Sequence, residues 1–183
     1  MRRALCIASV LVAAAAAGDP PKPRVTRAEL AAVETSFDQR IARLSVADDP
    51  MEVLGSTRGV YLEGYGAVFT TEVNLVITPP ITPFRMKITK EEVARVHQRK
   101  LERLPTLKRA MRAMLVSSAA SLDDVPTNEQ VVVGVTLFFL NWEDRTGLPS
   151  QIVMQAPRRP LLEYNLSTST SEALEAAIRE QVF

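Results

Sequence analysis

The segment best suited to chemistry, residues 58–69, combines glycines with hydroxyl and carboxylate side chains. Four of the seven glycines lie within residues 55–66. Tyr61, Glu63 and Tyr65 alternate, so a strand would place them on one face, where they could contact a ligand. The same pattern fits a structural hairpin whose glycines adopt positive φ and whose tyrosines pack across strands. No strand-to-helix glycine run followed by Lys-Ser or Lys-Thr occurs, which excludes a nucleotide phosphate loop.

His97 is the single histidine, and it lies between Val93 and Leu101 on an apolar helical stripe. A histidine base needs a carboxylate or hydroxyl partner, and a metal ion needs further ligands. We therefore expect His97 to be a hydrogen-bonded core residue or a helix contact. The pattern predicts no catalytic residue, no metal site and no cofactor.

Basic residues crowd two predicted helices, with Glu102 as the only acid among them. They are Arg95, Arg99, Lys100, Arg103, Lys108, Arg109 and Arg112. Such a cluster could contact lipid headgroups or an acidic partner. Such a cluster is also typical of the solvent-exposed faces of two amphipathic helices.

Acidic residues are a further candidate, since a catalytic pair could be drawn from Glu63, Glu72, Glu143 and Asp144. Nothing in their spacing requires this chemistry. The chain contains neither a Gly-x-Ser-x-Gly elbow nor a Ser-x-x-Lys motif.

The first residues are typical of an export signal. Arg2 and Arg3 precede the apolar stretch Ala4–Val12, and small residues then lead to a cleavage site before Gly18. A membrane span needs roughly 20 apolar residues, so this stretch predicts no transmembrane anchor. We expect residues 1–17 to be removed and the protein to be periplasmic or extracellular.

The only cysteine, Cys6, lies inside this leader, so the mature chain would have no disulfide and no thiolate metal site. The chain has 22 basic and 21 acidic residues. This balance argues against nucleic-acid binding, which needs a clear basic excess.

Hydrophobic periodicity predicts helices and strands in a fixed order. Capping boxes at Thr26/Glu29 and Thr89/Glu92 predict two helix starts. Pro105 predicts a break between two central helices. The expected elements are a helix from Thr26 to about Ser45, strands Val53–Leu62 and Tyr65–Thr78, two helices between Thr89 and Asp123, strands Gln130–Trp142 and Ile152–Ala156, and a terminal helix reaching Val182.

This order, α-ββ-αα-ββ-α, predicts an α+β fold with a mainly antiparallel sheet of two hairpins and helices packed on it. The run Gln130–Trp142 is apolar on both faces and predicts a central strand. Residues 18–25 form a proline-rich lead-in, and residues 26–183 form a single domain.

Residues 58–69, together with Thr-Gly-Leu-Pro-Ser at 146–150, resemble an uncharacterised family of exported bacterial proteins. The resemblance runs over much of the mature chain. It implies no known activity and no catalytic residues.

We therefore expect an exported, non-catalytic domain that binds a protein or an envelope component. The candidate binding surface comprises Tyr61, Glu63, Tyr65, Arg99, Arg103, Trp142 and Glu143. Two alternatives stay open. One is a carboxylate-based exported hydrolase, and the other is a carrier of a small apolar ligand, which needs an enclosed apolar cavity of about 300 Å³.

Overall fold

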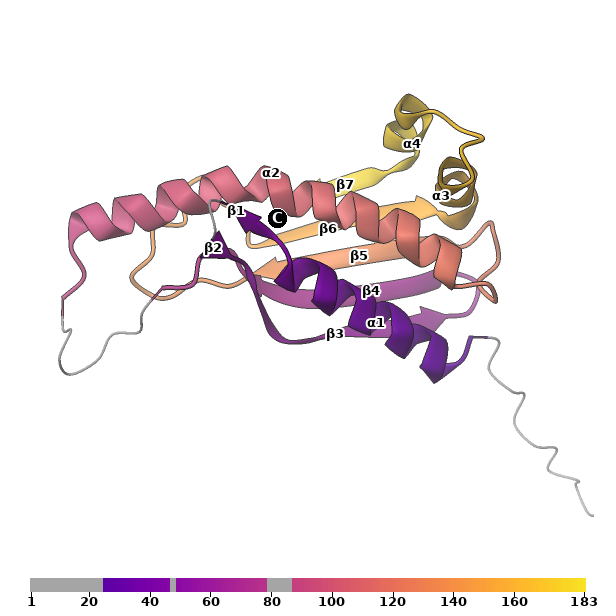
Figure 1. Ribbon diagram of the computed structural model, residues 1–183, viewed down its shortest axis with the longest axis horizontal. Helices are drawn as coiled ribbons and strands as arrows, with labels where there is room; N and C mark the ends of the chain where they lie inside the picture. The colour runs from indigo at the N-terminus through magenta and orange to yellow at the C-terminus, as the bar shows by residue number, and fades with distance from the viewer. Residues whose placement is uncertain (1–24, 47–48, 79–86) are drawn as a thin grey trace, which may run out of the picture.

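Helices lie against one face of a five-stranded sheet in this computed structural model, which describes residues 25–46, 49–78 and 87–183 (Figure 1). The predicted export signal and residues 18–24 of the lead-in lie outside these ranges. The helices are α1 (Arg27–Ala42), α2 (Lys90–Ser121), α3 (Arg158–Asn165) and α4 (Ser171–Ala177). The strands are β1 (Ser45–Val46), β2 (Asp49–Pro50), β3 (Glu52–Leu62), β4 (Gly66–Asn74), β5 (Gln130–Leu137), β6 (Gln151–Pro157) and β7 (Arg179–Val182).

The sheet has the strand order β3-β4-β5-β6-β7, and β1 pairs separately with β2. Its β3–β4, β5–β6 and β6–β7 pairs are antiparallel, whereas β4 and β5 are parallel. The α+β class is thus confirmed. The prediction of a mainly antiparallel sheet of two hairpins is wrong in its strand arrangement, because β4 and β5 form a parallel pair and β7 adds a fifth strand.

The parallel pair follows from the number of helices between β4 and β5. One helix returns the chain to the end of the sheet where β4 begins, so Gly66 pairs with Gln130 and the strands run together. The predicted pair of helices would have returned the chain twice. Helix α2 instead continues for 32 residues through Pro105.

Helix α2 tolerates Pro105 because its packed face is continuous across that position. Pro105 is exposed, whereas Arg103 and Leu107 on either side of it are buried. A proline removes one hydrogen bond of the helix, but burial of the same face before and after it favours a single helix.

The predicted terminal helix is also partly wrong, since α4 ends at Ala177 and β7 follows it. Strand β7 pairs with β6, and the backbone N–H of Phe183 donates to the carbonyl of Gln151 at 3.0 Å. Glu180 binds Lys108 of α2, with its Oε1 2.6 Å from Nζ. The edge of β6 thus offers this segment contacts that a short helix would not make.

The core lies between the helices and the sheet. The apolar side of α1 is buried, and the Phe37 ring packs edge-to-face on Phe69 of β4, with centroids 5.2 Å apart. Strand β5 is third of the five strands, so the prediction of a central strand is confirmed. Both predicted capping boxes, at Thr26 and at Thr89, are present. Within the described ranges, no helix is both long enough and apolar enough to cross a bilayer.

Candidate binding site

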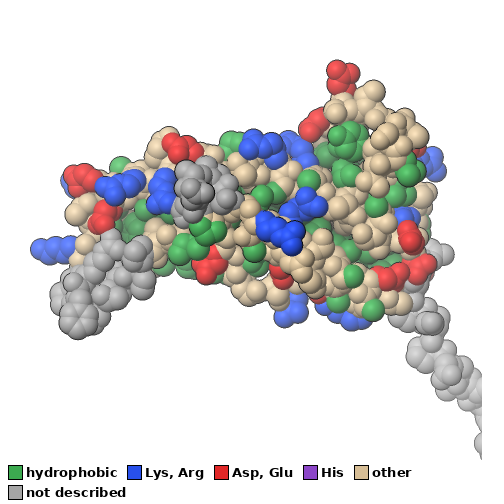
Figure 2. Space-filling view, viewed as in Figure 1, with side chains coloured by type: hydrophobic (Ala, Val, Ile, Leu, Met, Phe, Trp, Pro, Cys, Tyr) green, Lys and Arg blue, Asp and Glu red, His purple; other side chains and the backbone are tan. Residues whose placement is uncertain are grey.

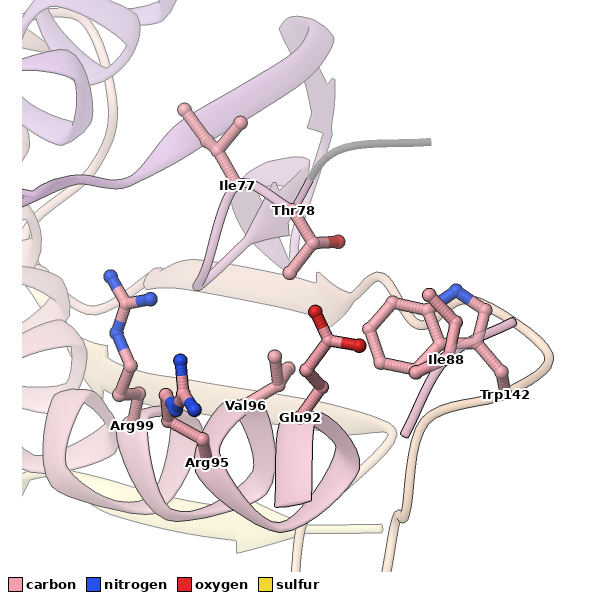
Figure 3. Close-up of a pocket in the computed structure, with 8 residues that line it drawn as sticks. All are labelled: Ile77, Thr78, Ile88, Glu92, Arg95, Val96, Arg99 and Trp142. Atoms are coloured by element: carbon pink, nitrogen blue, oxygen red, sulfur yellow. The ribbon is translucent and has the colours of Figure 1, made fainter. Parts of the chain in front are cut away.

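A pocket of about 140 Å³ lies between the N-terminal half of α2, the residues after β4 and the loop that joins β5 to β6 (Figure 3). Its lining residues are Ile77, Thr78, Ile88, Glu92, Arg95, Val96, Arg99 and Trp142. Figure 2 shows Lys and Arg side chains, with acidic ones beside them, over this end of the molecule at the left of the view. The pocket thus joins charged groups to an apolar wall.

Helix geometry explains why these side chains share the pocket. Glu92, Arg95, Val96 and Arg99 are spaced three or four residues apart, so they lie on one side of α2. Figure 3 shows Arg95 and Arg99 reaching from successive turns of α2 toward the segment after β4 that carries Ile77. Two guanidinium groups therefore flank one opening.

The opposite wall is largely apolar and comes from segments outside α2. Ile77 and Thr78 follow β4, Ile88 precedes α2, and Trp142 comes from the β5–β6 loop (Figure 3). Trp142 is half-buried and packs on the edge of the main core. This wall suits an apolar side chain or a short hydrocarbon segment.

A buried ion pair beneath the pocket fixes the loop that carries Trp142. Lys100 of α2 bonds to Glu143, and their side chains are 1% and 2% exposed. The Lys100 ammonium also donates to the carbonyl of Phe138 at 2.9 Å and lies 4.5 Å from the centre of the Phe139 ring. Burial lowers the pKa of Lys100, and the Glu143 carboxylate opposes that change.

Glu143 is only partly satisfied by this pair. Its Oε1 atom is buried and has no hydrogen-bond partner among the described residues. A carboxylate held in this way is an anchor for the loop. The pair stabilises the loop only while both partners are present.

Arg103 fixes the segment on the other side of the pocket. Its side chain is buried and donates to the carbonyl of Leu75 and, at 3.3 Å, to that of Pro50. Burial lowers the pKa of Arg103. Arg103 thus positions the chain after β4, which carries Ile77 and Thr78.

His97 makes a further contact between α2 and the β5–β6 loop. It is half-buried, and its Nδ1 lies 3.1 Å from the carbonyl oxygen of Asp144. The Asp144 carboxylate accepts from the backbone N–H and the hydroxyl of Thr146, which lowers the pKa of Asp144. His97 is therefore a helix contact, one of the two roles expected for it.

The structure brings together four of the seven predicted binding residues. Arg99 and Trp142 line the pocket, while Arg103 and Glu143 lie beneath it. The other three belong to the β3–β4 hairpin at the opposite end of β4. Tyr61 is half-buried against the core, and Glu63 and Tyr65 are exposed near the turn.

Steric constraints account for the glycines of that hairpin. Gly64 and Gly66 have φ values of +79° and +134°. A Cβ atom on Gly66 would lie 1.9 Å from the carbonyl oxygen of Gln130 in β5. The hairpin needs these glycines for its own turn and for its close approach to β5, whether or not a ligand binds there.

No sequence pattern indicated most of the apolar wall, Ile77, Ile88 and Val96, or the lining residues Thr78 and Glu92. Arg95 was recognised only as part of the basic cluster. Helical spacing relates Glu92, Arg95 and Val96 to one another. No periodicity relates them to Ile77 or Trp142, which lie on other segments of the chain.

The carboxylates considered for a hydrolase lie in different surroundings. Glu63 is at the hairpin turn, Glu72 is exposed on β4, Glu143 is buried and Asp144 is exposed. No group of three or more His, Cys, Asp or Glu side chains that could hold a metal ion occurs in the described ranges.

No family model, curated protein or solved structure matches the chain.

Proposed function

We propose that this chain is an exported, non-catalytic binding domain whose α2 pocket receives an acidic segment of a protein partner. The leader in the sequence supports export. The observation that carries the binding role is the placement of Arg95 and Arg99 around the same opening as Trp142. Arginines beside an apolar wall suit a carboxylate next to an apolar side chain.

Much of the basic cluster already has partners, which favours a protein segment over a broad anionic surface. Lys100 and Arg103 are buried, and Lys108 and Arg112 both bind Glu180. Arg95 and Arg99 are the members of the cluster that line the pocket, so their positive charge is local to it. Binding to a flat anionic surface would instead draw on basic residues over a wider area.

The positions of the acidic residues support binding rather than hydrolysis. Two-carboxylate mechanisms place the two groups about 5–10 Å apart in one cleft. Glu143 instead binds Lys100 beneath the pocket, while Glu63 lies at the far hairpin and Glu72 is exposed on β4. Glu143 thus has a structural role that explains its burial.

The test is affinity capture from envelope extract with the wild-type domain, an Arg95→Glu variant and an Arg159→Glu variant. Arg95 and Arg159 are both exposed, but Arg159 lies in α3 at the other end of the sheet. We expect a partner that is retained by wild type and by Arg159→Glu and reduced at least tenfold by Arg95→Glu. Equal capture by all three proteins, or capture of nothing, would contradict the proposal.

A further inference from the structure

A second concave surface, distinct from the α2 pocket, crosses the outer side of α2. It is a trough of about 390 Å³ with Ala113, Val116 and Ser117 on its floor. Arg40 of α1 forms one wall, and Tyr164 of α3 and Leu174 of α4 form the other. Figure 1 shows α1 and the α3–α4 pair on opposite sides of α2.

Most charges around the trough are already balanced. Arg112 Nε lies 3.1 Å from Glu175 Oε2, and Arg112 Nη2 lies 3.1 Å from Glu180 Oε2. Lys108 also binds Glu180. These two cations and two carboxylates form a closed surface network that fastens α4 and β7 to α2.

Arg40 is the exception. Its guanidinium makes no hydrogen bond or ion pair with any residue in the described ranges, and its Nε is buried without a partner. Figure 2 shows Lys and Arg side chains between α1 and α2 in the middle of the view. An N–H group that is buried without an acceptor is costly, since it has lost water without gaining a protein contact.

We propose that this trough binds a small monocarboxylate with an apolar tail. The carboxylate would accept hydrogen bonds from Arg40, and the tail would lie over Ala113, Val116 and Leu174. Arginine and a carboxylate match as a pair of parallel hydrogen bonds. The trough volume falls near the lower end of the range for small-molecule sites, about 300–1,000 Å³.

The charges of the trough select this class of ligand. A neutral apolar molecule would leave the Arg40 donors unsatisfied. A dianion such as a phosphate monoester would bring two negative charges to a single uncompensated cation, Arg40. It would also be repelled by the Glu175 carboxylate, which lines the trough. A single negative charge on a tail that fits the apolar floor satisfies both constraints.

The test uses octanoate as the probe and NMR of the whole mature domain as the readout. We expect saturable shifts of the Val116 and Leu174 methyl groups and of the Arg40 Nε–H, with weaker binding of octanol. Arg40→Gln should weaken octanoate at least tenfold, since it removes a charged donor pair. Arg43→Gln removes the same charge from an exposed residue of the same helix end and should leave the affinity unchanged.

Several results would overturn the inference. They are the absence of saturable shifts, equal affinity of wild type and Arg40→Gln for octanoate, or shifts confined to residues around Trp142. Arg40→Lys keeps the charge without the planar fork, so intermediate affinity is expected. Dispersed amide spectra of each variant would establish that it is folded. The site is separate from the α2 pocket, so either proposal can fail alone.

Discussion

At the scale of single residues, two glycines with positive φ at the turn of the β3–β4 hairpin differ in the space around them. Gly66 abuts the backbone of Gln130, whereas a Cβ atom on Gly64 would meet nothing within 4 Å. A substitution at Gly64 therefore tests the backbone conformation alone, whereas a substitution at Gly66 also tests steric overlap with β5.

We predict that Gly66→Ala destabilises the fold by about 3 kcal/mol or more, because β4 and β5 would have to separate where they first pair. Gly64→Ala should cost about 1 kcal/mol, the price of a left-handed conformation alone. Urea unfolding of both variants measures the difference. Equal losses would show that the approach of β4 to β5 relaxes without cost.

The Lys100–Glu143 pair gives a second prediction at this scale. Lys100→Met leaves the Glu143 carboxylate buried without its cation, so we expect a loss of about 3–5 kcal/mol. The single tryptophan, Trp142, is the neighbour of Glu143 in the loop and reports on it directly. Its emission should shift to longer wavelength as the loop loosens.

The matched control replaces both partners. In Lys100→Met with Glu143→Leu, no charge is left buried, so the double variant should be more stable than Lys100→Met alone. Additive losses from the two substitutions would contradict the assignment of the pair as a mutual anchor.

At the scale of elements, the continuity of α2 through Pro105 determines the topology. Pro105 lacks the N–H that would bond to the preceding turn, and its side chain is exposed. We predict that Pro105→Ala raises the free energy of unfolding by about 1–3 kcal/mol. The substitution removes the cost of a proline inside a helix, but it also makes the unfolded chain more flexible, which offsets part of the gain.

Thermal unfolding followed by circular dichroism measures this change, and far-ultraviolet helicity should be equal or higher. A loss of stability would mean that packing of α2 depends on the conformation that Pro105 imposes. Leu107→Ala provides the contrast, since it empties a buried position on the packed face and should cost about 2–5 kcal/mol.

The same helix shows what sequence patterns can and cannot predict about elements. Thr26 and Thr89 predicted helix starts because capping depends on residues only three positions apart. Pro105 was misleading because its effect depends on burial along both halves of α2. With two helices expected between β4 and β5, the predicted order of elements gave no reason to expect the parallel pair that these strands form.

At the scale of the whole molecule, the pocket could be predicted only in part. Arg99 belongs to a basic cluster visible in the sequence, and Trp142 follows an apolar strand. Their meeting with Ile77 depends on how α2 crosses the end of β4, which no local pattern encodes. The turn glycine Gly64 was easier to interpret, since turn geometry is local.

Acid stability is a property of the whole fold to which one buried carboxylate, Glu34, contributes. Glu34 of α1 accepts hydrogen bonds from the backbone N–H of Gly59 in β3 at 2.6 Å and from Arg27 Nη1 at 2.7 Å. Arg27 holds the pKa of Glu34 below the ordinary value of 4.5. Because the folded-state pKa is the lower one, this stabilisation is fully present above about pH 4.5 and is lost as the pH falls through the folded-state pKa.

We therefore predict that the urea midpoint of the wild-type protein falls as the pH is lowered from 5 toward 3, and that this slope is shallower in Glu34→Gln. The amide can still accept from Gly59, so the variant should lose about 1–2 kcal/mol at neutral pH, mainly from the Arg27 interaction. Glu29→Gln is the control, because the pKa of Glu29 is also lowered, by hydrogen bonds from Thr26, but at a more exposed helix end. Parallel slopes for wild type and Glu34→Gln would show that the contact between α1 and β3 does not govern acid unfolding, and that carboxylates elsewhere in the sheet or its loops do.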